Sequence, residues 1–163
     1  MTDTGDVESV ERVIPASPEA IFDLLADPTR HRDIDGSGTV GAAKGPSQRL
    51  VLGSEFGMSM KMGIPYSMVS TVVEFDENRR IAWQTRGPTR LGAWAGGRIW
   101  RYEIEPVEGG SLVRESWDIS QESAITKPLV RMGGGKTREH MAATLARIEE
   151  LTADERPRPR SSS

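Results

Sequence analysis

The spacing of apolar residues along the chain changes twice, and each change predicts a different kind of element. Residues 6–14 mix valines and an isoleucine with charged residues and predict a first strand. Ser17 then supplies a helix N-cap and Pro18 suits the first helical turn, so the apolar residues that follow predict a helix ending at Asp27-Pro28. Residues 29–34 are compatible with a second short helix before a glycine-rich turn.

From about residue 39 to residue 120, apolar and polar positions alternate with the period of a half-buried strand. Turn sequences such as Glu108-Gly109-Gly110 separate the alternating runs, which predicts an antiparallel meander. One predicted strand has Tyr66, Met68, Ser70 and Val72 on one face and Val69, Thr71, Val73 and Phe75 on the other.

The last element is predicted to be a long amphipathic helix. Its apolar stripe recurs at helical spacing in Met141, Leu145, Ile148 and Leu151. Glycines at 133–135 interrupt the pattern, so the helix is expected to begin near Lys136. This apolar stripe must pack against another apolar surface. A curved antiparallel sheet wrapped around the helix provides that surface and leaves a space between the two layers. The prediction is one α+β domain over residues 1–153, followed by a disordered basic tail over 154–163.

Two stretches of the chain resemble a known family. The first is Ala16-Ser17-Pro18-Glu19-Ala20-Ile21-Phe22-Asp23-Leu24-Leu25-Ala26-Asp27-Pro28. The second runs through Trp100-Arg101-Tyr102-Glu103-Ile104-Glu105-Pro106, Gly109-Gly110-Ser111 and Val113-Arg114-Glu115-Ser116-Trp117. Together they resemble the polyketide cyclase/dehydrase family of the START-related (SRPBCC) lipid-binding superfamily, over Val7 to about Ala153. The resemblance implies a helix-grip fold, in which a curved antiparallel sheet wraps around the C-terminal helix.

The resemblance leaves three kinds of function open, because one fold can carry many different sites. The first is binding of a small hydrophobic ligand, lipid-like or polyketide-like, in an internal cavity. The second is a polyketide cyclase or dehydratase that moves protons inside the same cavity. The third is binding of a large partner on the outer surface, for which the basic tail gives the only support.

Composition excludes several other classes of protein. The 163 residues include no cysteine, so disulfides, thiolate metal sites and a cysteine nucleophile are excluded. The 21 Lys and Arg residues are spread along the chain against 24 Asp and Glu residues, which argues against a nucleic-acid partner. No apolar run approaches the roughly 20 residues of a membrane span, and no signal-like start is present, so we expect a cytoplasmic protein.

Bound metals and cofactors are not expected either. The chain has two distant histidines and no matching ligand spacing. Gly133-Gly134-Gly135-Lys136-Thr137 resembles the end of a phosphate-binding loop, but Val130 stands where that loop requires its first glycine. The oligomeric state stays open between a monomer and a homodimer.

Aromatic residues and methionines concentrate in the predicted sheet, where they suit an apolar ligand. All four tryptophans, including Trp94, lie in this region. Flat aromatic surface and adaptable methionine side chains favour a cavity for ring-shaped molecules, whereas ordinary core packing is the alternative for each residue. The candidate cavity residues are Met60, Tyr66, Met68, Trp83, Trp100, Tyr102, Glu115, Trp117, Met141 and Leu145.

Three residues are candidates for proton transfer: Glu115, Tyr102 and His31. Glu115 shares strand parity with apolar residues, so its carboxyl group should face the interior and have a raised pKa. The alternative is a structural ion pair with Arg101 or Arg98 on the neighbouring strand. His31 follows the first helix and is a candidate general base, the alternative being a surface histidine between two arginines.

Overall fold

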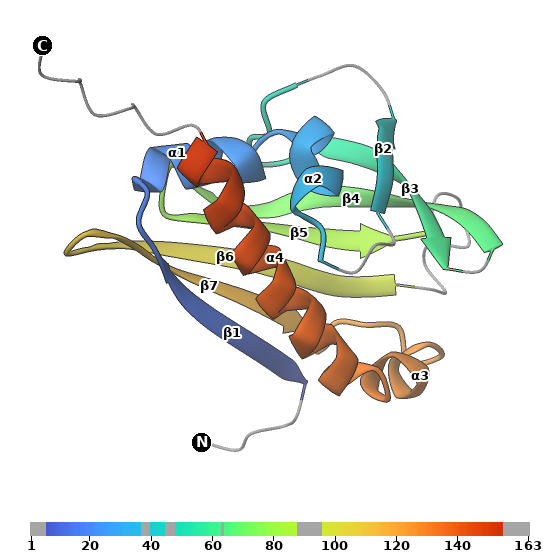
Figure 1. Ribbon diagram of the computed structural model, residues 1–163. Coiled ribbons are helices and arrows are strands. Elements are labelled where there is room, and N and C mark those ends of the chain that lie inside the picture. The colour runs from blue at the N-terminus through green and yellow to red at the C-terminus, as the bar shows by residue number, and fades with distance from the viewer. Residues whose placement is uncertain (1–5, 37–39, 45–47, 63, 88–95, 155–163) are drawn as a thin grey trace, which may run out of the picture.

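A strongly curved antiparallel sheet wraps around one long helix in the computed structural model, which describes residues 6–36, 40–44, 48–62, 64–87 and 96–154 (Figure 1). Within these residues the sheet has seven strands in the order β1-β7-β6-β5-β4-β3-β2. Six strands therefore form a meander in chain order, and the first strand returns to pair with the last. The strands are β1 Val7–Ile14, β2 Val40–Lys44, β3 Glu55–Met62, β4 Ile64–Asp76, β5 Arg80–Arg86, β6 Gly96–Val107 and β7 Gly110–Asp118.

The first helices and the long last helix lie on the concave side of the sheet, and one short helix lies at the end of the molecule (Figure 1). Ser17 caps the first of them as predicted, because its Oγ accepts a hydrogen bond of 3.2 Å from the backbone NH of Ala20. The predicted second helix is present as a 3-10 turn followed by one short α-helix. The helical elements are α1 Pro18–Leu25, η1 Pro28–Arg30, α2 His31–Ile34, α3 Lys127–Arg131 and α4 Gly134–Asp154.

The apolar stripe of α4 packs into the concave face, as its spacing predicted. Met141, Leu145 and Ile148 are buried, and Leu151 packs against the core that contains Leu145 and Ile148. The helix begins at Gly134, two residues before the predicted start at Lys136. A glycine in a helix costs only about 1 kcal/mol relative to alanine, so tertiary packing overrides the sequence signal. Of the predicted basic tail over 154–163, Asp154 is the last residue of α4, and residues 155–163 lie outside the described residues.

A β-bulge in β4 changes which face one aromatic residue occupies. The register between β4 and β5 shifts between Val72 and Glu74, so the residues beyond the bulge exchange faces. Phe75 therefore packs against the core, with its ring edge-on to Phe22 at a centroid distance of 5.5 Å. The predicted separation of Phe75 from Val72 onto opposite faces is wrong, because strict alternation does not anticipate an inserted residue.

The register of the last hairpin positions the candidate site. Tyr102 on β6 lies directly opposite Glu115 on β7, and Trp100 lies opposite Trp117. On the other side of β6, β5 places Ile81 beside Tyr102. Because alternate residues of a strand share a face, the members of each pair point to the same side of the sheet.

Candidate functional site

The centre of the concave face holds a hydrogen-bonded pair of polar side chains. The hydroxyl group of Tyr102 donates to Oε1 of Glu115 over 2.7 Å, and both side chains are buried, Glu115 with 2 % of its surface exposed. No other described group bonds to the second carboxyl oxygen, Oε2, although that atom is also buried. A buried polar atom without a partner is uncommon, because losing its hydrogen bonds to water costs about 1–3 kcal/mol.

Burial gives this pair unusual acidities. Loss of solvation raises the pKa of Glu115 to about 8; the Tyr102 hydrogen bond lowers it, and the negative charge of Asp35 raises it. The pKa of Tyr102 is raised well above its ordinary value, first by burial and then by the charge of Glu115. At neutral pH the carboxyl group is therefore mostly protonated, and it carries an O–H that can be donated.

The predicted alternative, an ion pair between Glu115 and an arginine, is wrong for the described residues. Arg98 pairs with the buried Glu122 over 3.2 Å. Arg101 pairs with Glu74 over 2.6 Å and points to the outer face. Strand parity explains the second case, since Arg101 adjoins the inward-facing Tyr102 and must point the other way.

His31 lies in the interior rather than on the surface, so its predicted alternative as a surface histidine is also wrong. The residue opens α2, and its Nε2 lies 2.8 Å from the backbone oxygen of Leu25. A carbonyl oxygen only accepts, so Nε2 is the protonated nitrogen and donates this bond. Burial lowers the pKa of His31 to about 4, partly offset by the Leu25 bond and by Asp27. His31 is therefore neutral at neutral pH.

A stack of rings connects the three candidates for proton transfer. The His31 ring lies over Trp83 with centroids 4.7 Å apart, and Trp83 lies 5.5 Å from Tyr102. Tyr102 then bonds to Glu115. Residues from α2, β5, β6 and β7 therefore meet at one place. Asp35, which follows α2 and acts on the pKa of both Tyr102 and Glu115, was not identified from the sequence, because nothing in its neighbourhood marks it.

The other candidate cavity residues divide between two apolar clusters. Trp83, Tyr102 and Leu145 belong to the main core, whereas Trp117 and Met141 form a second cluster with Ile119. The half-buried Trp100 packs against both clusters, and Met68 is half-buried. The side chains of Met60 and Tyr66, and the whole of Trp94, lie outside the described part of the structure.

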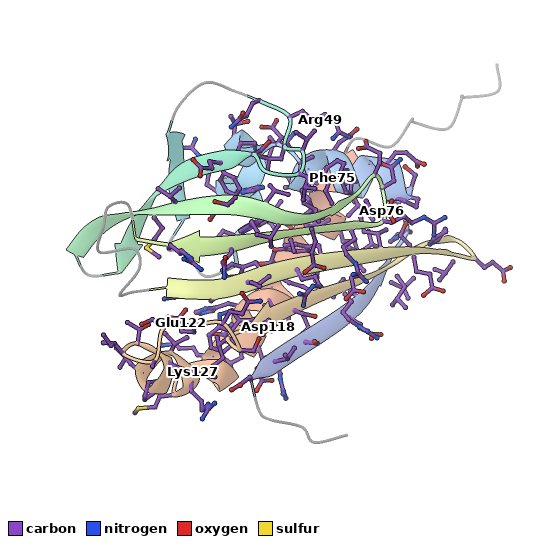
Figure 2. The ribbon with its side chains drawn as sticks, turned by 180° about the vertical axis from the view of Figure 1, so that it is seen from behind. Arg49, Phe75, Asp76, Asp118, Glu122 and Lys127 are labelled. Atoms are coloured by element: carbon purple, nitrogen blue, oxygen red, sulfur yellow. The ribbon has the colours of Figure 1, made fainter. Side chains whose placement is uncertain are left out.

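A separate open groove of about 690 Å³ lies on the other side of the molecule, between the β4–β5 turn and the β6–β7 hairpin. Figure 2 labels Phe75 and Asp76, the last two residues of β4, which line this groove. Its charged walls pair with one another, Arg80 bonding to both Glu74 and Glu103. Such a surface suits water better than an apolar ligand. The groove is lined by Glu74, Phe75, Asp76, Arg79, Arg80, Glu103, Ile104, Glu105, Leu112 and Arg114.

Two further findings concern the described residues. Their histidine, aspartate and glutamate side chains form no group of three or more that could hold a metal ion. None of their helices is long and apolar enough to cross a bilayer.

Comparison with known proteins agrees with this architecture. Residues 7–152 match the family described as polyketide cyclase / dehydrase and lipid transport. The chain belongs to this family. The match extends from β1 to the last turn of α4, so this polyketide cyclase/dehydrase and lipid transport domain includes every strand and helix described above.

Relatives of this family member include longer proteins. The uncharacterized protein Rv0088 of Mycobacterium tuberculosis is 38 % identical over 124 residues, which are 74 % of this chain and 50 % of Rv0088. The uncharacterized protein MT0096 of another Mycobacterium tuberculosis strain is 37 % identical over 124 residues, which are again 74 % of this chain and 50 % of the relative. The chain thus spans about half the length of the curated relatives that it matches.

Solved structures share the fold of this family member at low sequence identity. Protein NE0264 from Nitrosomonas europaea superimposes with a TM-score of 0.71 and 15 % identity, covering 94 % of this chain and 98 % of the other. DynU16, from the dynemicin biosynthetic locus, superimposes with a TM-score of 0.63 and 10 % identity. The match covers 93 % of this chain and 49 % of DynU16. The predicted helix-grip fold is confirmed.

Proposed function

We propose that the chain binds a small, mostly apolar molecule between the concave face of its sheet and α4, with a polar group of that molecule at Glu115. The observation that carries the proposal is the buried Oε2 of Glu115, which has no hydrogen-bond partner among the described residues. A ligand atom at this position would supply the missing bond.

The acidity of Glu115 indicates which ligand group would bind there. With the pKa at about 8 the carboxyl group is mostly protonated at neutral pH. Oε1 accepts from Tyr102, so the proton belongs on Oε2, which then acts as a donor. The matching ligand group is an acceptor, such as a carbonyl or hydroxyl oxygen. Lipid-like and polyketide-like molecules both carry such oxygens on an apolar body.

The surrounding aromatic side chains support the apolar part of the proposal. Trp83 is buried beside Tyr102, and the half-buried Trp100 occupies the next position along β6 on the same face. Flat indole rings make large contacts with rings and acyl chains at a small loss of side-chain entropy. They also provide a signal, because a ligand that contacts them changes tryptophan fluorescence.

Native mass spectrometry of the purified protein, followed by solvent extraction of whatever is released on unfolding, tests the proposal. We expect an apolar molecule with at least one acceptor oxygen. The extracted compound should bind the apo protein and change its tryptophan emission. Glu115→Leu should weaken this binding by about tenfold or more, because an apolar side chain leaves the ligand oxygen unpaired. Equal affinity for the folded variant and the parent would contradict a role for Glu115.

A second candidate function is a cyclase or dehydratase reaction on a polyketide-type substrate. The observation that favours it is a carboxyl group with a pKa of about 8, since such a group can both give and take a proton near neutral pH. Tyr102 would then be a positioning residue that fixes the orientation of the carboxyl group. Unchanged turnover of such a substrate in the Glu115→Gln variant would exclude Glu115 from the reaction.

A further inference from the structure

We propose that the segment from Ser123 to Met132, called the α3 segment here, docks the protein on a lipid bilayer that carries anionic headgroups. The segment contains α3 and lies beside the start of α4, at one end of the molecule (Figure 1). This surface is separate from the interior site described above, and the inference does not depend on the proposed ligand.

The first observation is an unusual concentration of exposed apolar side chains. Ile125, Leu129 and Met132 have exposures of 65 %, 73 % and 84 %, the three highest values among the large apolar residues of the described chain. All three fall within eight consecutive residues. A cluster of this kind marks an interaction site, whereas a single exposed apolar residue does not.

The segment is held firmly against the body of the protein. Val130 packs against the cluster formed by Trp117, Ile119 and Met141. Before the helix, Thr126 Oγ1 donates a hydrogen bond of 2.5 Å to the buried carboxylate of Glu122. The exposed apolar residues therefore project from an anchored element.

The charge around these residues favours an anionic surface. Residues 123–138 contain four basic side chains, Lys127, Arg131, Lys136 and Arg138, and no acidic one. Two carboxylates near the start of β1 balance part of this charge. Asp6 pairs with Lys127 and Arg131, and Glu8 pairs with Arg138. Lys136 remains exposed with no partner among the described residues, and the region keeps one positive charge in surplus even when the adjoining exposed Glu139 is counted with Asp6 and Glu8.

The small size of the patch favours a bilayer over a protein partner. A stable protein interface buries about 1,200–2,000 Å² in total, which three apolar side chains on and beside a five-residue helix do not supply. Insertion into the interfacial region of a bilayer requires only a few apolar side chains, and nearby lysines and arginines add attraction to anionic headgroups. The α3 segment combines both features.

Co-sedimentation with vesicles tests this inference. The protein should bind vesicles of phosphatidylcholine with phosphatidylglycerol more tightly than vesicles of phosphatidylcholine alone, and added salt should weaken the binding. The combined variant Ile125→Ser, Leu129→Ser and Met132→Ser should lose roughly tenfold or more in partitioning. The matched control is Val51→Ser with Leu52→Ser, which alters residues of 53 % and 63 % exposure elsewhere and should bind like the parent.

A pair of charge variants makes the test independent of apolar packing. Lys136→Gln should weaken binding to the anionic vesicles about threefold to fivefold. Arg79→Gln, which removes an exposed cation from the β4–β5 turn, should leave it unchanged. Figure 2 shows that the neighbouring Asp76 lies at the opposite corner from Lys127.

Three results would overturn the inference. The first is a lack of binding to either kind of vesicle. The second is equal binding by the folded apolar variant and the parent protein, with near-UV circular dichroism as the check on folding. The third is a parent protein that is dimeric by native mass spectrometry and becomes monomeric in the apolar variant, because the patch would then be covered by a second copy.

Discussion

Tyr102 and Glu115 lie directly opposite each other on β6 and β7, and the tyrosine hydroxyl group donates a hydrogen bond of 2.7 Å to the carboxyl group. This bond uses one carboxyl oxygen and leaves the other for a different partner. Tyr102 therefore orients the group that we propose to recognise a ligand. Burial of both residues keeps the pair uncharged at neutral pH.

Glu115→Gln should make the stability of the protein less sensitive to a rise in pH from 4.5 to about 8. The pKa of Glu115 is raised from 4.5 to about 8 on folding, so its contribution to stability is complete below pH 4.5 and is lost as the pH rises to about 8. Over this range the parent should lose at most about 1.4 kcal/mol per pH unit relative to the variant. Thermal unfolding at pH 5, 6.5 and 8 measures the difference. The exposed Glu105→Gln on β6 is the control, and parallel pH profiles for Glu115→Gln and the parent would refute the raised pKa.

Tyr102→Phe should destabilise the fold by about 1–3 kcal/mol, because it leaves the buried carboxyl group without its remaining hydrogen bond. The same change should raise the pKa of Glu115 further, since the tyrosine bond lowers it. Urea unfolding measures the free energy of unfolding, and its pH dependence measures the change in the pKa of Glu115. The combination Tyr102→Phe with Glu115→Leu should cost less than the sum of the two single changes, and simple additivity would indicate that the residues are not coupled.

The sequence predicted those features that depend on local chemistry or on a regular period. The Ser17 cap, the alternating strands and the apolar stripe of α4 are of this kind, and so is the inward direction of Glu115. Features that depend on long-range contacts were missed. The burial of His31 follows from its contacts with Trp83 and Leu25, and the face of Phe75 follows from a bulge. Likewise, only the folded structure shows that Arg98 forms an ion pair with Glu122.

His31 should limit the stability of the protein in acid. Its pKa falls from 6.5 to about 4 on folding, so its contribution is complete above pH 6.5 and is lost as the pH falls to about 4. His31→Phe should reduce this loss of stability in acid. The lost hydrogen bond to Leu25 should nevertheless lower the stability of the variant at neutral pH by about 1 kcal/mol. Melting temperatures from pH 4 to pH 7 measure both effects. His140→Gln on α4 serves as the control. If His31→Phe loses as much stability in acid as the parent does, that result would count against the lowered pKa of His31.

Gly36→Ala should destabilise the protein, because the backbone after α2 passes very close to α4. An added Cβ would lie 2.4 Å from the backbone oxygen of His140 and 2.7 Å from the Cβ of Ala143. Neither contact can be relieved by rotating a side chain, so we expect a loss of about 1–3 kcal/mol. Gly135→Ala is the matched comparison. The Cβ added at position 135 would have no atom within 4 Å, so this variant should gain up to about 1 kcal/mol of stability. Equal melting temperatures for the two variants would contradict this close approach.

The place of β1 in the sheet has a consequence for folding. Among the described strands it pairs with β7 alone, and the bonded hydroxyl groups of Ser9 and Ser116 join residues 107 positions apart. Ion pairs also join β1 to α4, Glu8 with Arg138 and Arg12 with Glu149, the latter at a separation of 137 residues. Among the described elements β1 is synthesised first, whereas β7 and α4, which it contacts, are made only after the other strands. Until then its valines have no neighbour in the sheet, and folding should be slow for a domain of this size.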